Sequence, residues 1–446
     1  MTEPADLAPG FRMTEIGSLS EDWEIARIGD LFDMRQGKSL SPRGRLGLSP
    51  VPFLRTANVL WGRVDLTKVD QMDFSEREVE VYSLRPGDLL VCEGGDVGRT
   101  ALWTGALDPC CYQNHLHRLR AKRDDVWPPF YAFWMQAALA LLGLYVGTEN
   151  RSTIPNLSQA RLRVFAVPLP PLSEQRSIAA VLNTTRRAVE ATEKVLAVAR
   201  ELKRSLLQYL FTHGPVPHGQ ADQVVLKETE IGPVPEAWDV VPVSSLAQSL
   251  RYGTSARCND ETGTPVLRIP NVVEGAIRTD GLKLLIPSIR EAEKLRLQQG
   301  DLLFVRTNAS RDRVGRCAVY HSELPDALFA SYLIRARFDP ARVMPEYVHY
   351  YTWSPRGRRF FYENATGAGD GKFNINTQTI RALPVPLPDL AVQREIVRTI
   401  TAVDARARAA EARKVALQVL FNAMLRQLMV GQVRVNHLDL PIEEQT

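Results

Sequence analysis

Two similar halves, each ending in a long helix, set the strongest limit on how this 446-residue chain can fold. The segment "TEIGSLSEDWEI" (Thr14–Ile25) recurs as "TEIGPVPEAWDV" (Thr229–Val240), and "VGRTALW" (Val97–Trp103) recurs as "VGRCAVY" (Val314–Tyr320). The offset is about 215 to 218 residues, which is far too long for a solenoid repeat. The chain is therefore predicted to contain a duplicated domain.

Each half closes with a proline-containing segment, here called the gate, followed by a helical pattern. The gate helix start "VPLPPLSEQRSIAAVL" (Val167–Leu182) parallels "VPLPDLAVQREIVRTI" (Val385–Ile400), and Ser173 is expected to cap the first helix. Apolar or small residues then recur at alternating steps of four and three, the heptad pattern of a coiled coil. The predicted seams are Ile178, Leu182, Thr185, Val189, Thr192, Leu196, Ala199, Leu206 and Leu210, and Ile396, Ile400, Val403, Ala407, Ala410, Leu417, Phe421, Met424 and Leu428, with Lys203 and Lys414 as polar interruptions.

Within each half, short strand-like runs are followed by aromatic-rich helical segments, which predicts an α+β globule. The predicted fold is two tandem α+β domains separated by two long helices that pair as an antiparallel coiled coil with pseudo-twofold symmetry; parallel pairing is the alternative. The predicted parts are an N-terminal tail (1–14), a first domain (15–165), a first gate and helix (166–214), a linker (215–229), a second domain (230–383), a second gate and helix (384–430) and a C-terminal tail (431–446).

Motif searches find no catalytic or metal site. The five cysteines form no C-x-x-C pair, the seven histidines lack ligand spacing, and no nucleotide-binding loop fits its required context. The uncharged segment Pro129–Val146 approaches membrane-helix length, but its polar counterpart in the second half predicts a buried helix instead. No signal peptide is recognisable, so a cytoplasmic protein without membrane contact is expected.

Arginines in glycine-containing loops are the candidates for binding a polyanion, with solvated surface arginines as the alternative. The net charge of +4 adds only a mild preference for such a partner. Arginine's planar fork suits phosphates and guanine edges. Because the loops differ between halves whose scaffold motifs agree, two recognition modules of different specificity are predicted. The candidate DNA-binding residues are Arg35, Lys38, Arg43, Arg45, Arg55, Arg99, Arg251, Arg257, Arg268, Arg306, Asn308, Arg311, Arg313, Arg316 and Lys372.

"TEIGPVPEAWDV", the two gates and the paired helices together resemble the specificity (S) subunit of type I restriction–modification enzymes, over nearly the whole chain. The resemblance implies that each globule is a target recognition domain reading one half of an asymmetric bipartite site in double-stranded DNA, while the coiled coil sets the unread spacer. The chain itself would be non-catalytic and hold no cofactor.

The resemblance also implies partners: two methyltransferase subunits, and motor–nuclease subunits where the system has them. S-adenosylmethionine, ATP and Mg²⁺ would be bound only by those partners. The second gate lacks the acidic residue that precedes the Gln-Arg pair in the first. The candidates for methyltransferase docking are Glu174, Gln175, Arg176, Gln393 and Arg394.

Two alternatives remain open at this point. The chain could serve a methyltransferase without a nuclease, which the sequence cannot separate from a full restriction complex. It could also be a coiled-coil scaffold whose two domains bind protein, in which case no salt-dependent DNA affinity is expected.

Overall fold

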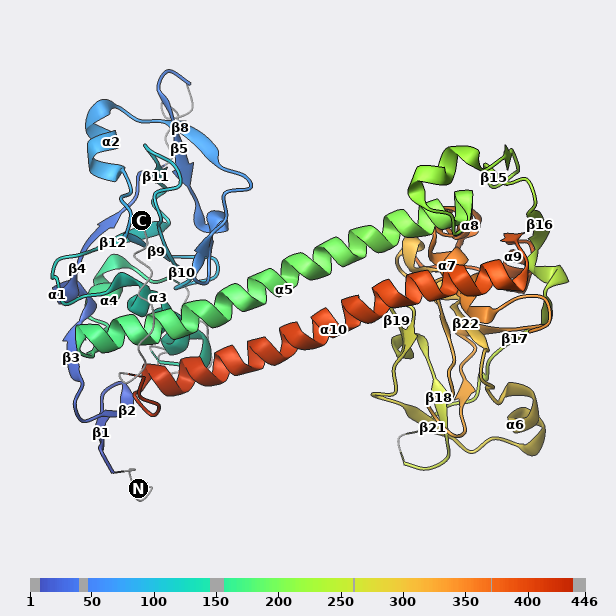
Figure 1. The fold of residues 1–446 in the computed structure, drawn as a ribbon. Coiled ribbons are helices and arrows are strands. Elements are labelled where there is room, and N and C mark those ends of the chain that lie inside the picture. Colours follow the sequence, from blue (N-terminus) through green and yellow to red (C-terminus); the bar gives the residue numbers. More distant parts are fainter. Residues whose placement is uncertain (1–8, 40–46, 145–155, 260, 370, 436–446) are drawn as a thin grey trace. The chain divides into compact units, whose positions relative to one another are not determined.

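The chain divides into two compact units that both contain parts of the same two long helices. The computed structural model describes residues 9–39, 47–144, 156–259, 261–369 and 371–435. Unit 1 comprises Met1–Thr192 and Ala412–Thr446, and unit 2 comprises Glu193–Glu411. The division between the units thus falls within both long helices, which are labelled α5 and α10 in Figure 1.

Unit 1 follows the order of short strands and helices expected of an α+β domain. Its strands are β1 (Phe11–Thr14), β2 (Gly17–Ser20), β3 (Glu24–Arg27), β4 (Phe32–Gln36), β5 (Pro50–Leu54), β6 (Val59–Leu60), β7 (Arg63–Val64), β8 (Asp70–Asp73), β9 (Leu89–Cys92), β10 (Thr100–Leu102), β11 (Cys111–Tyr112), β12 (Leu116–Ala121) and β13 (Ala166–Leu169). Its helices are α1 (Ile28–Leu31), α2 (Glu76–Tyr82), α3 (Pro128–Gln136) and α4 (Gln159–Arg163), and α5 (Leu172–His213) begins in it.

Unit 2 repeats this order after a linker. Its strands are β14 (Leu226–Lys227), β15 (Val234–Pro235), β16 (Asp239–Pro242), β17 (Ala247–Tyr252), β18 (Thr264–Leu267), β19 (Val272–Val273), β20 (Ala276–Ile277), β21 (Lys283–Leu285), β22 (Leu302–Val305), β23 (Thr307–Asn308), β24 (Cys317–Val319), β25 (Leu328–Phe329), β26 (Leu333–Phe338), β27 (Thr366–Gly367), β28 (Phe373–Asn374) and β29 (Pro384–Leu387). Its helices are α6 (Ile289–Leu295), α7 (Pro345–Trp353), α8 (Pro355–Asn364) and α9 (Thr377–Arg381), and α10 (Leu390–Met429) begins in it.

The two units contain the same central sheet. Unit 1 has the antiparallel order β10-β9-β12-β4, and unit 2 has the matching order β24-β22-β26-β17. A three-stranded sheet accompanies each, β11-β5-β8 in unit 1 and β25-β18-β21 in unit 2. In unit 1, alternate residues of the central sheet pack against α3 and against the smaller sheet, because side chains alternate between the faces of a strand. The predicted domain duplication is therefore confirmed in the fold.

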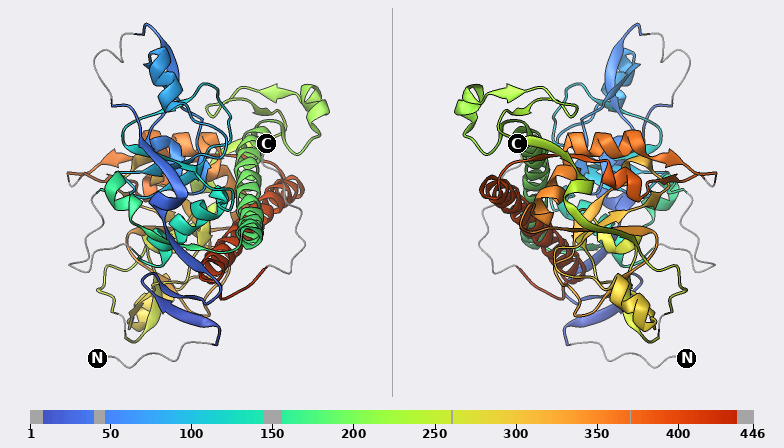
Figure 2. Two further views of the ribbon diagram at one scale, coloured as in Figure 1. Left: turned by 90° about the vertical axis from the view of Figure 1, so that its left-hand side faces the viewer. Right: turned by 90° about the vertical axis from the view of Figure 1, so that its right-hand side faces the viewer.

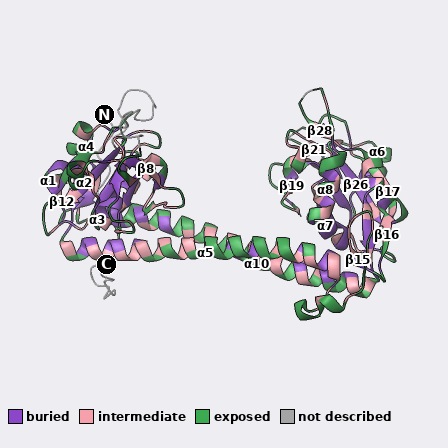
Figure 3. Cartoon of the chain, turned by 90° about the horizontal axis from the view of Figure 1, so that it is seen from above, coloured by how far each residue is buried: buried purple, intermediate pink, exposed green. Residues whose placement is uncertain are grey.

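The two long helices run antiparallel in each unit. In unit 1 the hydroxyl of Thr185 lies 3.8 Å from the sulfur of Met424, and in unit 2 the ammonium of Lys203 lies 2.6 Å from the carboxylate of Asp404. The early part of α5 thus faces the late part of α10 in unit 1, and the late part of α5 faces the early part of α10 in unit 2. Figure 2 looks along the two helices, which lie beside one another. Every predicted seam residue is buried or half-buried, while outward positions are exposed (Figure 3). The predicted antiparallel pairing is confirmed.

Lys203 interrupts the seam of α5 without leaving a charge unpaired. Its ammonium forms the ion pair with Asp404 and lies 5.6 Å from the centre of the Tyr350 ring. The Tyr350 hydroxyl donates to the same carboxylate at 3.1 Å. The lysine therefore links α5 to α10 and to α7, which fixes the register of the helices in unit 2.

The expected cap of α5 is wrong, because the helix begins one residue earlier than Ser173 and contains it. The amides of Glu174 and Gln175 donate to the Pro171 carbonyl at 2.9 and 3.0 Å. At the start of α10, Asp389 occupies the position that Pro171 occupies before α5. Its carboxylate accepts from the Val392 amide at 2.9 Å. Only the second helix start therefore has a side-chain cap of this kind.

The apolar segment after Pro128 forms a buried helix, as predicted. α3 contributes Phe130, Tyr131 and Trp134 to the core of unit 1 and continues as a π-helical turn, Ala137–Leu141. Among the described residues, no helix is long and apolar enough to cross a bilayer.

Two segments expected to be tails contribute to unit 1. Residues 11–14 form β1, which pairs with β2, and Arg434 donates to the Ser20 hydroxyl at 3.0 Å. Gly431, at φ 75°, ends α10 against the ring of Trp23, as Gly214, at φ 80°, ends α5 against Trp238 in unit 2. The end of the described chain is therefore packed against the first strands.

The buried His349 makes the stability of unit 2 depend on pH. Burial lowers its pKa from the ordinary 6.5 to about 3, and nearby Lys203 and His321 act in the same direction. The unfolded chain binds a proton below pH 6.5 that the folded chain refuses, so stability falls as pH drops below 6.5. We expect a loss of up to about 1.4 kcal/mol per pH unit from this residue. The free energy of unfolding, measured with urea between pH 7 and 5, should fall less steeply with decreasing pH for His349→Gln than for the unaltered chain. An equally steep fall would contradict the assignment.

Candidate DNA-recognition surface and helix junction

Each gate is an edge strand that attaches a long helix to its domain. β13 pairs with β3, and β29 pairs with β16, in two separate two-stranded sheets. Edge strands tolerate proline because one side needs no backbone donor. Tyr131 donates to the Pro168 carbonyl in unit 1, and Tyr347 donates to the Pro386 carbonyl in unit 2. The recurring "VPLP" motif is therefore explained by this attachment.

The glutamine of each Gln-Arg pair locks the helix start to the domain. Gln175 accepts from the Trp127 amide at 2.8 Å, and Gln393 accepts from the Met344 amide at 2.9 Å. The amide nitrogen of Gln175 donates to the carbonyls of Asp125 and Pro170, and that of Gln393 to the carbonyls of Arg342 and Pro388. Because both side chains are completely buried, the recurrence of glutamine follows from these matched bonds.

This burial corrects part of the docking hypothesis. Glu174, Gln175 and Gln393 are buried and bonded within the chain, so they offer no surface to a partner. Arg176 is half-buried, with its guanidinium 5.0 Å from the centre of the Trp127 ring, and Arg394 is exposed. Only these two arginines of the five residues remain docking candidates.

Glu174 belongs to a buried ionic contact found in unit 1. Its carboxylate receives two bonds from the Arg434 guanidinium, at 2.6 and 2.9 Å, and one from the Trp23 indole at 3.0 Å. Arg434 also reaches Ser20 and Asp22. The corresponding position in α10 is Val392. The acidic residue that the second gate lacks therefore serves a contact specific to unit 1.

An arginine–aspartate pair is repeated in both domains. Arg120 binds Asp88 through two bonds at 2.7 and 2.6 Å, and Arg337 binds Asp301 through two bonds at 2.7 Å. Both aspartates are fully buried and belong to the recurring "GDLL" motif. The motif is thus explained by a bidentate ion pair inside each domain.

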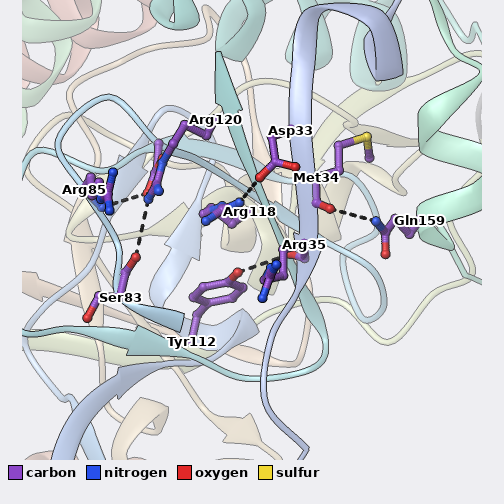
Figure 4. Close-up of polar contacts among 10 residues, drawn as sticks. Asp33, Met34, Arg35, Ser83, Arg85, Tyr112, Arg118, Arg120 and Gln159 are labelled. Atoms are coloured by element: carbon purple, nitrogen blue, oxygen red, sulfur yellow. Dashed lines mark hydrogen bonds and ion pairs between the residues drawn. The ribbon is translucent and has the colours of Figure 1, made fainter. Parts of the chain in front are cut away.

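The neighbouring arginine on the same strand differs between domains. Arg118 is buried and contacts the Asp33 carboxylate across β12 and β4 (Figure 4). In unit 2 the same register puts Ser249 opposite Arg337 and leaves Arg335 with one bond, to the Arg296 carbonyl at 3.2 Å. Burial and the nearby Arg337 and Arg251 lower the pKa of Arg335 to about 10, with Asp301 opposing them.

Several candidate DNA-binding residues are held by contacts within their own domain. Lys38 binds Glu78 at 2.8 Å, and Arg99 bonds the Thr56 carbonyl at 3.0 Å. Arg311 donates to the carbonyls of Glu363 and Ala365, which closes the end of α8. Similar contacts hold Arg55 to Asp70, Arg268 to Gly281, Asn308 to Ser310 and Arg316 to Asp312.

Other candidates lie on the surface. These exposed residues are Arg35, Arg251, Arg257, Arg313 and Lys372. Arg43 and Arg45 lie outside the described residues. In unit 2, exposed tyrosines accompany the arginines: Tyr252 is 38% exposed, Tyr362 50% and Tyr332 58%. The Arg306 guanidinium lies 5.0 Å from the centre of the Tyr252 ring, and that of Arg311 lies 4.8 Å from the Tyr362 ring. Such an arginine–aromatic surface is suited to nucleic acid.

Sequence reasoning missed the residues beside these arginines. Gln36 and Glu93 in unit 1 and Tyr252 in unit 2 were not candidates, although aligning the two halves around "GDLL" places Glu93 opposite Arg306. Within the described ranges no cluster of His, Cys, Asp or Glu could hold a metal ion, and all five cysteines are free.

Comparison with known proteins agrees with this geometry. Residues 20–199 match the family model described as type I restriction modification DNA specificity domain. Over that stretch the chain is similar to the specificity subunits of type I restriction–modification enzymes. The resemblance read from the two gates is thereby confirmed.

Relatives in this family match over most of the chain. The EcoKI specificity subunit of Escherichia coli K12 is 25% identical over 402 residues, 86% of this chain and 82% of that protein. The MjaVIII specificity subunit of Methanocaldococcus jannaschii is 23% identical over 426 residues, 94% of this chain and 95% of that protein. The crystal structure of a type I system S subunit from M. genitalium has a TM-score of 0.57 at 14% identity, covering 96% of this chain and 99% of that one, which supports the shared fold.

Proposed function

We propose that this chain is the DNA-recognition subunit of a type I restriction–modification complex, with each domain reading one half of an asymmetric bipartite site. The observation that carries the proposal is the pair of domains with one scaffold and different surfaces: the Gln175/Gln393 and Arg120/Arg337 contacts recur, while the surface residues at equivalent positions differ. Two copies of one fold that carry different surface side chains suit a DNA site whose two halves differ in sequence.

The partners in this proposal are double-stranded DNA, two methyltransferase subunits and, where the system has them, motor–nuclease subunits. Apolar side chains exposed on α5 and α10 support docking of other proteins on the helices. They are Val195 (57% exposed), Val198 (68%) and Leu202 (47%) on α5, and Val415 (56%), Val419 (65%) and Leu420 (49%) on α10. The chain's own role is binding and positioning, and S-adenosylmethionine, ATP and Mg²⁺ would be held by the partners.

Mapping methylated adenines tests the proposal. We expect co-expression of the chain with the methyltransferase subunit of its own system to methylate one bipartite motif with two different half-sites across a host genome. A matched culture expressing the methyltransferase subunit alone should lack that motif. Methylation without a bipartite motif, or a motif with symmetric halves, would contradict the proposal, and DNA affinity that does not fall with salt would favour a protein-binding scaffold.

A further inference from the structure

One position at the end of the central sheet keeps its backbone in both domains but exchanges its side chains. In unit 1 the Glu93 amide donates to the His115 carbonyl, and the Leu157 amide donates to the Glu93 carbonyl. In unit 2 the Arg306 amide donates to the Tyr332 carbonyl, and the Ile375 amide donates to the Arg306 carbonyl. Glu93 and Arg306 therefore occupy equivalent places, directly after β9 and β22.

A neighbouring strand supplies the second member of each pair. Gln36 lies opposite His117 at the end of β4, and Tyr252 lies opposite Ile334 at the end of β17. Gln36 donates to the Glu93 carboxylate at 2.8 Å and to the Asn114 carbonyl at 2.8 Å.

In unit 2 the Arg306 guanidinium packs against Tyr252 and donates at 3.3 Å to the carbonyl of Ser331. Asn114 and Ser331 each immediately precede the residue whose carbonyl accepts from Glu93 or Arg306, so the same backbone oxygen is used in both domains. The two pairs therefore share one backbone frame.

The exchange reverses the chemistry offered to a ligand. Unit 1 presents a carboxylate and a primary amide, and unit 2 presents a guanidinium and a phenol. Structural pairs of the same domains do not behave this way, since Arg120–Asp88 and Arg337–Asp301 keep both bonds and both residue types. Two domains that read different half-sites are expected to differ in charge at a base-reading position while keeping the same backbone geometry there.

The two members of each pair differ in exposure, because Glu93 is only 9% exposed and Arg306 is half-buried, whereas their partners lie at the surface. Gln36 is exposed, Tyr252 is 38% exposed, and the adjoining Tyr332 is 58% exposed. After Glu93 the chain continues through Gly94 and Gly95, where an added Cβ would meet no atom within 4 Å. A backbone without side chains in open space permits close approach of a duplex.

We infer that Gln36 with Glu93, and Tyr252 with Arg306, are the equivalent specificity-determining contacts of the two domains, each setting the base preferred at one position of its half-site. The inference rests on the proposed function. Carboxylates accept from the cytosine amino group, glutamine pairs with adenine, and arginine pairs with guanine in the major groove. The first pair therefore favours a base that presents an amino donor, and the second favours guanine.

The experiment uses the full chain in complex with its methyltransferase subunit and reads base frequencies at every position of both half-sites from genome-wide adenine methylation. For Glu93→Gln we expect discrimination at one position of the first half-site to fall by about tenfold, with the second half-site unchanged. For Arg306→Gln we expect the same loss at one position of the second half-site only. Arg359→Gln, which removes an exposed arginine paired with Glu363 on α8, is the control and should change neither.

The outcomes separate the inference from the proposed function. If the unaltered complex methylates no bipartite motif, the proposed function fails. If it does so and both variants keep every base preference, the inference alone is overturned. Uniform weakening across all sequences would also overturn it, because that result marks a phosphate contact. The unaltered half-site in each variant reports that the chain is folded, and thermal unfolding of each complex checks this separately.

Discussion

A variant with four residues inserted into each of the two long helices is expected to modify sites whose unread spacer is one or two base pairs longer, with both half-sites unchanged. Four helical residues add about 6 Å along the axis, and one base pair adds about 3.4 Å. They also turn the helix by about 40°, close to the rotation of about 35° between successive base pairs. Both helices must be extended because α5 and α10 each contribute to both units.

An insertion of seven residues in each helix provides the comparison. It preserves the heptad seam and adds about 10 Å, the length of about three base pairs, yet it leaves the helix faces nearly unrotated. Three base pairs turn a half-site by about 100°, so we expect this variant to lose modification at any spacer. Methylation mapping of both variants is the measurement. Altered half-site bases, or an unchanged spacer after the four-residue insertion, would contradict the role of the helices as a spacer.

Removing the charge of Arg434 should destabilise unit 1 strongly. The Glu174 side chain is only 2% exposed, so Arg434→Met leaves a buried carboxylate with the Trp23 indole as its remaining donor. Breaking a buried pair on one side costs about 3–5 kcal/mol, and the lower figure applies because Arg434 is about a third exposed. A loss of about 3 kcal/mol should lower the unfolding temperature of this unit by about 6–12 °C.

Calorimetry with limited proteolysis can assign that loss to unit 1. Arg398→Met is the matched control, since it removes a surface arginine paired with Glu395 in α10 and should change stability by less than about 0.5 kcal/mol. Adding Glu174→Gln to Arg434→Met should recover part of the loss, because the buried charge disappears with its partner. Equal stability of Arg434→Met and the unaltered chain would show that the Arg434–Glu174 ion pair does not stabilise unit 1.

The features predictable from sequence are those with a local period or a repeated motif. The duplicated domain follows from matched segments such as those beginning at Thr14 and Thr229, and the helix pair follows from heptads, because seam residues must recur where the helices meet. The contact between Glu174 and Arg434 was not predictable, since it joins residues 260 positions apart. No local pattern marks such a contact.

The candidate site was predicted only in outline. Arginine content indicated the right class of surface, but it could not distinguish Arg311, which closes α8, from Arg313, which is exposed. Gln175 was predicted to contact a partner because glutamine recurs at both helix starts. Its side chain is instead buried within unit 1. Glu93 was overlooked because a single acidic residue in a glycine loop has no signature until the two halves are aligned around "GDLL".

The composition of unit 1 has a consequence for the order in which the protein is made. Unit 2 is a continuous stretch, residues 193–411, and can fold as soon as that stretch has left the ribosome. Unit 1 combines residues 9–192 with 412–435. Glu174 can therefore pair with Arg434 only after 260 further residues have been synthesised. A nascent chain that ends before that point would contain all of unit 2 but would lack the last segment of unit 1. Recognition of the whole bipartite site would thus depend on complete translation.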